Sequence, residues 1–237
     1  MTDARTRVMT AVAVAVLIAA LLPGAVAAAE KGKVVTPLGK NLEGWLAKGP
    51  VEQSKWAVGT AKVDPKNPRK LVVEAPGDCP HLATATGHGR DIYTAEKFGD
   101  CTVDLEVMVP KGSNSGIYLM GEYEVQVLDS FGKSKVGTGD MGGIYGATAP
   151  AVNASKAPGE WQKYVIEFKA PRFEDGKKVS NARFVKITLN GKVIHEDVEM
   201  KRNTPGGVSG KEAPAGPLMF QGNHGPVAYR NIKIILP

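Results

Sequence analysis

The sequence lacks the signatures of several common enzyme classes. It contains no G-x-S-x-G motif, no glycine-rich phosphate loop followed by Lys and Ser or Thr, and no H-E-x-x-H motif. A serine triad, a P-loop nucleotide site and a zincin centre are therefore unsupported. Helical periodicity is also nearly absent after residue 29. The 237 residues, 43% hydrophobic and 23% charged, fit one ordinary globular domain.

The sequence also lacks a concentrated basic surface. Its formal net charge is +6, but the lysines are scattered along the chain and no aromatic residues alternate with them. A nucleic-acid interface usually needs a basic stripe or patch. The charge is therefore predicted to aid solubility, and no nucleic-acid partner is expected.

Only the N-terminus carries a long apolar run. Arg5 and Arg7 precede apolar residues 8–22, and the small residues 25–29 that follow offer A-x-A cleavage sites. This order is typical of a Sec signal peptide, with a retained N-terminal anchor as the alternative. We predict a signal peptide at residues 1–29, a mature domain at residues 30–237, a secreted or periplasmic location, and no membrane association after cleavage.

Cysteine is scarce. Cys79 and Cys101 are the two cysteines of the chain. An even pair in an exported protein predicts a disulfide, which here would close a loop of about 22 residues and contribute roughly 3 kcal/mol in the chain-entropy model. A zinc site would need more ligands than the neighbouring His81 and His88 supply. No metal site or cofactor is predicted from the spacing.

The remaining sequence alternates apolar and polar residues with period two. Short alternating runs over 103–109, 123–128, 164–169 and 185–189 predict β-strands, and Asn190-Gly191 predicts a hairpin between the last of these and the run that follows. A final strand is expected over 227–236. Many short strands separated by turns predict an all-β sandwich or barrel. The Gly- and Pro-rich stretch 199–217 is predicted to be a long surface loop, either at the rim of a site or as a mobile edge.

Two polar residues interrupt an otherwise apolar strand pattern. Glu124 and Gln126 lie two residues apart, so they project side by side from one face of their strand. On the concave face of a sandwich, this carboxylate and carboxamide would suit sugar hydroxyls, and the carboxylate could act as a general base. The alternative is an ordinary solvated strand face.

A second group of polar residues precedes and enters the last strand. Gly222 and Gly225 flank Asn223-His224, a turn that would present both side chains. Histidine there can act as an acid, a base or a ligand, or it can be an ordinary surface residue. Arg230 shares the strand phase of Ile232 and Ile234, so it is predicted to point inward or into the groove. Its expected carboxylate partner is Glu124 or Asp129, in a catalytic or a purely structural ion pair.

Segments in order along the chain resemble the 3-keto-disaccharide hydrolase family. In sequence letters they are G-K-N-L-E-G-W at 39–45, N-S-G-I at 114–117, Y-E-V-Q-V-L-D at 123–129, G-I-Y-G at 143–146, P-G-E-W-Q at 158–162, and G-P, Q, H-G-P-V and Y-R-N-I between 216 and 232. From Phe173 to Asn181 this chain is longer than the family pattern.

The resemblance implies a concanavalin A-like jelly-roll β-sandwich of two antiparallel sheets. It also implies cleavage of glycosides whose C3 hydroxyl has been oxidised to a ketone, by elimination and hydration, with a 3-keto-glycoside as the carbohydrate partner. Our hypothesis assigns Glu124 or His224 as the base and Arg230 as the electrostatic stabiliser. The residues assigned to position the sugar are Asn114, Gln126, Gln221 and Asn223. A divalent cation could polarise the ketone, but the spacing shows no ligand set.

Two other functions share this fold. One is a non-catalytic carbohydrate-binding or cell-surface module, which would line its groove with aromatic platforms. The other is a conventional glycosidase, which needs two carboxylates about 5 to 10 Å apart. The residue two positions from Glu124 is Gln126, which argues against a conventional glycosidase. The oligomeric state is left open by the sequence.

Overall fold

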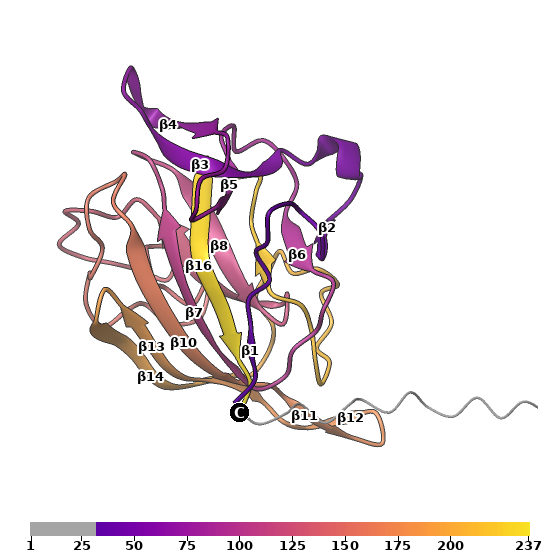
Figure 1. Cartoon of the computed structure of the whole chain (residues 1–237). Helices are drawn as coiled ribbons and strands as arrows, with labels where there is room; N and C mark the ends of the chain where they lie inside the picture. Colours follow the sequence, from indigo (N-terminus) through magenta and orange to yellow (C-terminus); the bar gives the residue numbers. More distant parts are fainter. Residues whose placement is uncertain (1–31) are drawn as a thin grey trace, which may run out of the picture.

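The chain forms a sandwich of two antiparallel sheets. The computed structural model describes residues 32–237, so the predicted signal peptide at 1–29 lies outside the described residues. Figure 1 shows the curved larger sheet, with β14, β13, β10, β7 and β16 lying side by side. In spatial order its strands are β14 (Lys192–Met200), β13 (Ala182–Leu189), β10 (Gln162–Lys169), β7 (Cys101–Met108), β16 (Val227–Ile235), β5 (His81–Thr84), β3 (Trp56–Asp64) and β4 (Asn67–Glu74), with β1 (Val34–Val35) also paired to β16.

The second sheet is smaller and carries the segment with Glu124. Its five strands are β2 (Trp45–Ala47), β6 (Ile92–Thr94), β15 (Met219–Phe220), β8 (Asn114–Leu119) and β9 (Tyr123–Leu128). A separate ribbon of β11 (Arg172–Glu174) and β12 (Lys177–Ser180) projects from the base in Figure 1 and accounts for the long 173–181 stretch. A short 3-10 helix, η1 (Val51–Gln53), follows β2.

The period-two pattern decides which side chains enter the core. In β7, Val103, Leu105 and Val107 are at most 1% exposed and pack between the sheets, while Asp104 and Glu106 face outward. The strands predicted over 103–109, 123–128, 164–169 and 185–189 and at the C-terminus are all present. The predicted jelly-roll β-sandwich is confirmed.

The Asn-Gly hairpin forms as predicted. Asn190 and Gly191 join β13 to β14 with φ angles of 52° and 79°. Both angles are positive, as a type I′ turn requires, and this turn matches the twist of the two strands it connects.

Aromatic rings join the two sheets through the core. Tyr229 of β16 stacks on Phe220 of β15 with ring centroids 3.9 Å apart, and the Trp45 ring centroid lies 5.5 Å from that of Phe220. Trp56 is also buried and donates its indole N–H to the carbonyl of Arg90 at 2.7 Å. Trp45 and Trp56 therefore pack in the core and are not sugar platforms.

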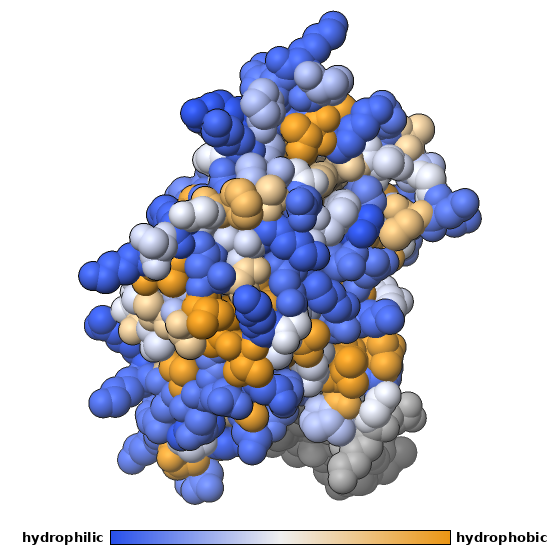
Figure 2. Space-filling model, turned by 90° about the vertical axis from the view of Figure 1, so that its left-hand side faces the viewer, coloured by the Kyte–Doolittle hydropathy of each residue, from blue (hydrophilic) through white to orange (hydrophobic). Residues whose placement is uncertain are grey.

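The face of the molecule drawn in Figure 2 is mostly hydrophilic. Seen from the left-hand side of Figure 1, apolar patches are separated by hydrophilic side chains (Figure 2). Within residues 32–237, no helix is long and apolar enough to cross a membrane.

The predicted disulfide between Cys79 and Cys101 is wrong in this structure, where both cysteines are free. Cys101 opens β7 and is buried on the core side, whereas the Cys79 thiol lies 3.5 Å from the amide oxygen of Asn231. Asn231 in turn donates to Glu106, on the outer face of β7 and five residues from Cys101. At about 3.3 Å per strand residue, Glu106 lies roughly 16 Å from Cys101 along β7. Cys79 therefore approaches the outer face of the sheet far from the buried Cys101 thiol, and a disulfide needs a Cα separation of about 4–7 Å.

The two thiols should therefore differ sharply in reactivity. Burial raises the pKa of the Cys101 thiol to about 12, so it is protonated and shielded in the native state, whereas Cys79 is exposed. An aromatic disulfide reagent applied without prior reduction should titrate Cys79 in the native protein and both thiols after unfolding. Detection of no thiol in the unreduced, unfolded protein would restore the disulfide.

Candidate functional site

A hollow of about 240 Å³ opens on the face of the five-stranded sheet that points away from the core. Strands β8 and β9 form its floor, and loops far apart in the sequence form its walls. It is lined by Asn114, Tyr118, Glu124, Gln126, Tyr145, Pro205, Gly206, Gln221 and His224. The structure thus brings together five of the residues predicted from sequence: Asn114, Glu124, Gln126, Gln221 and His224.

The alternation of β9 places Glu124 and Gln126 on the floor of this hollow. Tyr123, Val125 and Val127 are fully buried in the core, so the residues between them project to the opposite face. That face is covered, because Glu124 is only 3% exposed and Gln126 only 5%. The alternative of an ordinary solvated strand face is therefore wrong.

Glycine at position 116 makes room for the Glu124 carboxylate. Strand β8 pairs with β9 so that Tyr118 lies opposite Glu124 and Gly116 lies opposite Gln126. A Cβ atom on Gly116 would lie 2.2 Å from Glu124 Oε1. The carboxylate therefore lies across the strand where a side chain is missing, and any larger residue at 116 would displace it.

Two loops hold the backbone of Glu124 on the free edge of β9. The backbone N–H of Glu124 donates to Thr204 Oγ1 at 2.9 Å, and its carbonyl accepts from the N–H of Tyr145 at 3.1 Å. Thr204 belongs to the Gly- and Pro-rich stretch predicted as a surface loop, of which residues 199 and 200 complete β14. The structure favours the first form of that prediction, a rim of the site.

A second buried carboxylate, Glu122, fixes this rim. Glu122 Oε1 accepts from the backbone N–H and the hydroxyl of Ser209, both at 2.7 Å, and Oε2 accepts from the N–H of Gly210 at 3.1 Å. The Thr204 hydroxyl donates to the carbonyl of Glu122 at 3.0 Å. Because its oxygens are already bonded to the loop, Glu122 is a structural anchor.

The environment of Glu124 changes its acidity. Burial raises its pKa to about 7, a hydrogen bond from the Tyr118 hydroxyl works in the opposite direction, and the charge of Asp91 raises the pKa further. Burial, with the Glu124 charge as the next contribution, also raises the pKa of Tyr118, so its phenol stays protonated at neutral pH. The site therefore pairs a carboxyl group that titrates near neutrality with a phenol that can donate a hydrogen bond.

Amide side chains line the rest of the floor. Gln126 donates its amide N–H to Asn114 Oδ1 at 3.3 Å, and Gln221 lies with Nε2 3.5 Å from the Tyr118 hydroxyl. Gln126 Oε1 is buried and has no hydrogen-bond partner among residues 32–237. A buried acceptor without a partner at the edge of a hollow suits a hydroxyl donor from a ligand.

His224 stands at the rim and is exposed, with its ring in contact with the Asn223 amide oxygen. Asn223 is exposed and supports His224 without lining the hollow itself. The flanking glycines are explained by close packing: a Cβ on Gly222 would lie 2.3 Å from the Arg90 carbonyl oxygen, and one on Gly225 would lie 2.2 Å from Ser113 Oγ. The turn can thus sit tightly against its neighbours and present His224 outward.

The predicted placement of Arg230 in this site is wrong. Its guanidinium pairs with Glu106, not with Glu124 or Asp129, at 2.5 Å, and lies 4.0 Å from the centre of the Trp161 ring. Glu106 is on the outer face of the larger sheet, across the sandwich from Glu124. Asn231, with a φ of 52°, marks the β-bulge that shifts the register of β16, so Arg230 does not share the inward phase of Ile232.

No group of three or more His, Cys, Asp or Glu side chains that could hold a metal ion is found among residues 32–237.

Three residues of the site were missed in the sequence. Tyr118 shares the floor with Glu124, Tyr145 forms part of the wall, and Gly116 accommodates the carboxylate. The glycine in the middle of an apolar strand run was a readable signal of a close approach. Tyr145 lies in the G-I-Y-G segment at 143–146, but its place in the site depends on how residues 142–145 pair with the edge of β9.

Comparison with known proteins identifies the family. A search of curated protein sequences finds no significant match. The model of the 3-keto-alpha-glucoside-1,2-lyase-like domain matches residues 35–235. A crystal structure of a proposed glycosyl hydrolase from Parabacteroides distasonis is 28% identical, with a TM-score of 0.65, and the match covers 85% of this chain and 82% of that chain.

Two further structures of proposed glycosyl hydrolases from the same organism share the fold. One is 16% identical with a TM-score of 0.57, covering 86% of this chain and 93% of that chain. The other is 21% identical with a TM-score of 0.55, covering 85% and 98%. Since the family match spans almost the whole described part of the chain, this protein belongs to the family of 3-keto-alpha-glucoside-1,2-lyase-like domains.

Proposed function

We propose that this protein cleaves 3-keto-glycosides by elimination, with Glu124 as the base that removes the proton from C2 of the sugar. The observation that carries the proposal is a buried carboxylate, with a pKa raised to about 7, on the floor of a hollow lined by amides and a phenol. The family to which the chain belongs supports the same chemistry.

The proposed reaction matches what the hollow contains. A ketone at C3 acidifies the hydrogen on C2, so ionised Glu124 can take that proton. The electron pair then forms the C1–C2 double bond as the C1–oxygen bond breaks, the leaving group gains a proton, and water adds to the resulting enone. A base that titrates near the working pH is the most effective for such a transfer.

Donors in the hollow would stabilise the charge that develops on the ketone oxygen. Arg230 was assigned this role from the sequence, but it lies on the other side of the sandwich. Tyr118 and His224 line the hollow, and Tyr118 lies opposite Glu124 on the paired strand, with its hydroxyl 3.4 Å from the carbonyl oxygen of Pro205. We assign electrostatic stabilisation to these two groups, and sugar positioning to Asn114, Gln126 and Gln221.

Glu124→Gln should abolish cleavage. The amide preserves the shape of the side chain but cannot accept the C2 proton, so we expect kcat to fall by about 100-fold or more. The assay follows release of the leaving group from a 3-keto-glucoside and from its unoxidised parent, with and without a metal chelator.

Two control variants separate this role from general damage. Glu167→Gln makes the same change on the outer face of β10, in an exposed pair with Lys186, and should leave turnover unchanged. Arg230→Gln should leave kcat within a few-fold of wild type. Undiminished turnover by Glu124→Gln would remove Glu124 from the chemistry. Binding of the sugar by a wild-type protein that cleaves neither substrate would favour the carbohydrate-binding module.

The pH dependence follows from the raised pKa of Glu124. Only the ionised carboxylate acts as a base, so kcat/KM should rise about tenfold per pH unit on the acid side and level off above pH 7. A profile measured from pH 5 to 9 tests this expectation. A profile that is already level across this range would show that the base is an ordinary exposed carboxylate or another group.

The raised pKa of Glu124 also lowers the stability of the folded protein as the pH rises. Its folded pKa of about 7 lies above the unfolded value of 4.5, so the folded state binds the proton more tightly and stability falls as the pH rises between these values. Glu124→Gln removes this loss. We expect the variant to gain about 1 to 3 kcal/mol over wild type at pH 8 and little at pH 4.5, measured by thermal unfolding. An equal change at both pH values would contradict the assigned pKa.

Export is also proposed, on the basis of the sequence of residues 1–29. N-terminal sequencing of the protein recovered from the periplasm or the medium should begin close to residue 30. Recovery of the full-length chain in the cytoplasm would contradict this.

A further inference from the structure

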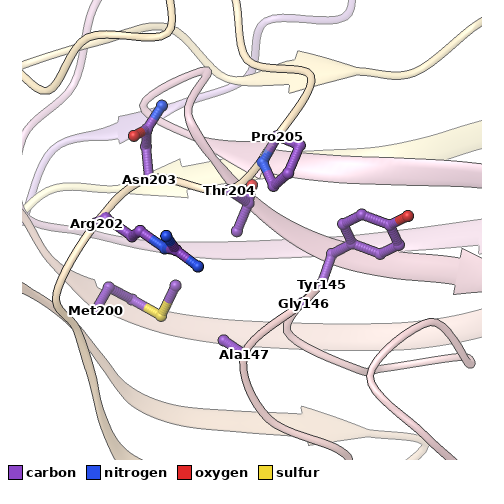
Figure 3. A pocket seen from close by; sticks show the side chains of 8 residues that line it. All are labelled: Tyr145, Gly146, Ala147, Met200, Arg202, Asn203, Thr204 and Pro205. Carbon is purple, nitrogen blue, oxygen red and sulfur yellow. The ribbon is translucent and has the colours of Figure 1, made fainter.

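A second hollow lies beside the first on the same side of the molecule. It has a volume of about 360 Å³. It is formed where the loop after β14, residues 201–217 (the rim loop), passes residues 145–147. It is lined by Tyr145, Gly146, Ala147, Met200, Arg202, Asn203, Thr204 and Pro205 (Figure 3).

The two hollows share a wall. Tyr145 and Pro205 line both of them, so a ligand can lie across these two residues with one part in each hollow. With volumes of about 240 and 360 Å³, the pair together reaches the size of an ordinary small-molecule site, about 300–1,000 Å³. A sugar ring over Glu124 would therefore direct the group attached to it into the second hollow.

The walls of the second hollow are largely apolar. Met200 is 4% exposed, and Ala147 and Pro205 add aliphatic surface. Tyr145 is 40% exposed, so its ring is available to a ligand. A ring of tyrosine together with a methionine thioether favours contact with a flat apolar or aromatic group.

Two of the four polar side chains that line the hollow, Thr204 and Asn203, are already engaged. The Thr204 hydroxyl accepts from the N–H of Glu124 and donates to the Glu122 carbonyl. Asn203 directs its amide N–H at Glu122 Oε2, 3.4 Å away. Few groups remain to satisfy the several hydroxyls of a second sugar ring, which disfavours a disaccharide here.

Arg202 is the charged side chain that lines the hollow. Figure 3 shows its guanidinium reaching into the hollow from the rim loop. No carboxylate lines the hollow, and Arg202, which is exposed, makes no salt bridge with the described residues. A guanidinium with open donors in an apolar hollow is suited to bind a carboxylate in a bidentate manner.

We propose that this second hollow is the leaving-group subsite and that it selects an aromatic aglycone bearing a carboxylate, through Tyr145 and Arg202. The inference rests on the proposed function for the identity of the group in the first hollow. The flat ring would lie against Tyr145 and Met200, and the carboxylate would pair with Arg202.

Binding measurements test the subsite without relying on turnover. Calorimetry compares 4-carboxyphenyl glucoside with its neutral isostere, 4-carbamoylphenyl glucoside, on the wild-type protein, Arg202→Gln and Arg202→Lys. We expect the wild type to prefer the carboxylate by about 5- to 10-fold, Arg202→Gln to lose this preference, and Arg202→Lys to keep part of it. The preference should shrink as the salt concentration rises. Equal affinities for the two ligands on the wild type, no measurable binding of the carboxylate, or an unchanged preference in Arg202→Gln would each overturn the proposal.

Turnover separates this inference from the proposed function. The 3-keto forms of both aryl glucosides and of methyl glucoside are compared by kcat/KM. Cleavage of all three with the same charged-to-neutral ratio in wild type and Arg202→Gln would overturn the subsite and leave the lyase intact. A carboxylate preference in binding, without cleavage of any of the three, would overturn the lyase and leave the subsite.

Discussion

The Glu124 carboxylate is confined from several sides, and the arrangement of the site follows from that confinement. It lies over Gly116, where a Cβ would come within 2.2 Å, and Tyr118 lies opposite it on the paired strand. Its backbone is bonded to Thr204 on one side and to Tyr145 on the other. The loops that carry Thr204 and Tyr145 thus close the edge of β9 around a carboxyl group whose pKa is raised by burial.

The sandwich keeps its two clusters of polar residues on opposite faces. On the outside of the larger sheet, Arg230 is held by Glu106 and by the ring of Trp161. Burial opposes ionisation of Glu106, but the hydrogen bond and charge of Arg230 lower its pKa overall, so the pair is ionised at neutral pH. The ion pair between Arg230 and Glu106 is therefore a structural feature of the larger sheet. Arg230 is thus not available to the proposed site on the other face, where Tyr118 and His224 line the hollow.

The rim loop serves both hollows. Glu122 fixes Ser209 and Gly210, and through Thr204 it fixes the segment that carries Arg202 and Pro205. The first hollow is therefore built mostly on strands and the second mostly on loops. Site residues carried by strands are held more rigidly than those carried by loops, and loops vary more readily among related proteins. A lyase could keep its chemistry on the strands and change the aglycone it accepts by altering the rim.

The sequence determined the strand pattern, the Asn-Gly hairpin, and the placement of Glu124 and Gln126 on one face, because a strand alternates its side chains whatever surrounds it. Its ordered motifs also identified the family. Only the tertiary structure decided what covers that face. It brought Asn114, Gln221 and His224 to Glu124, and moved Arg230 away through a β-bulge that period-two counting cannot foresee. It likewise separated Cys79 from Cys101, since the distance between two residues depends on the strand register and not on their spacing in the chain.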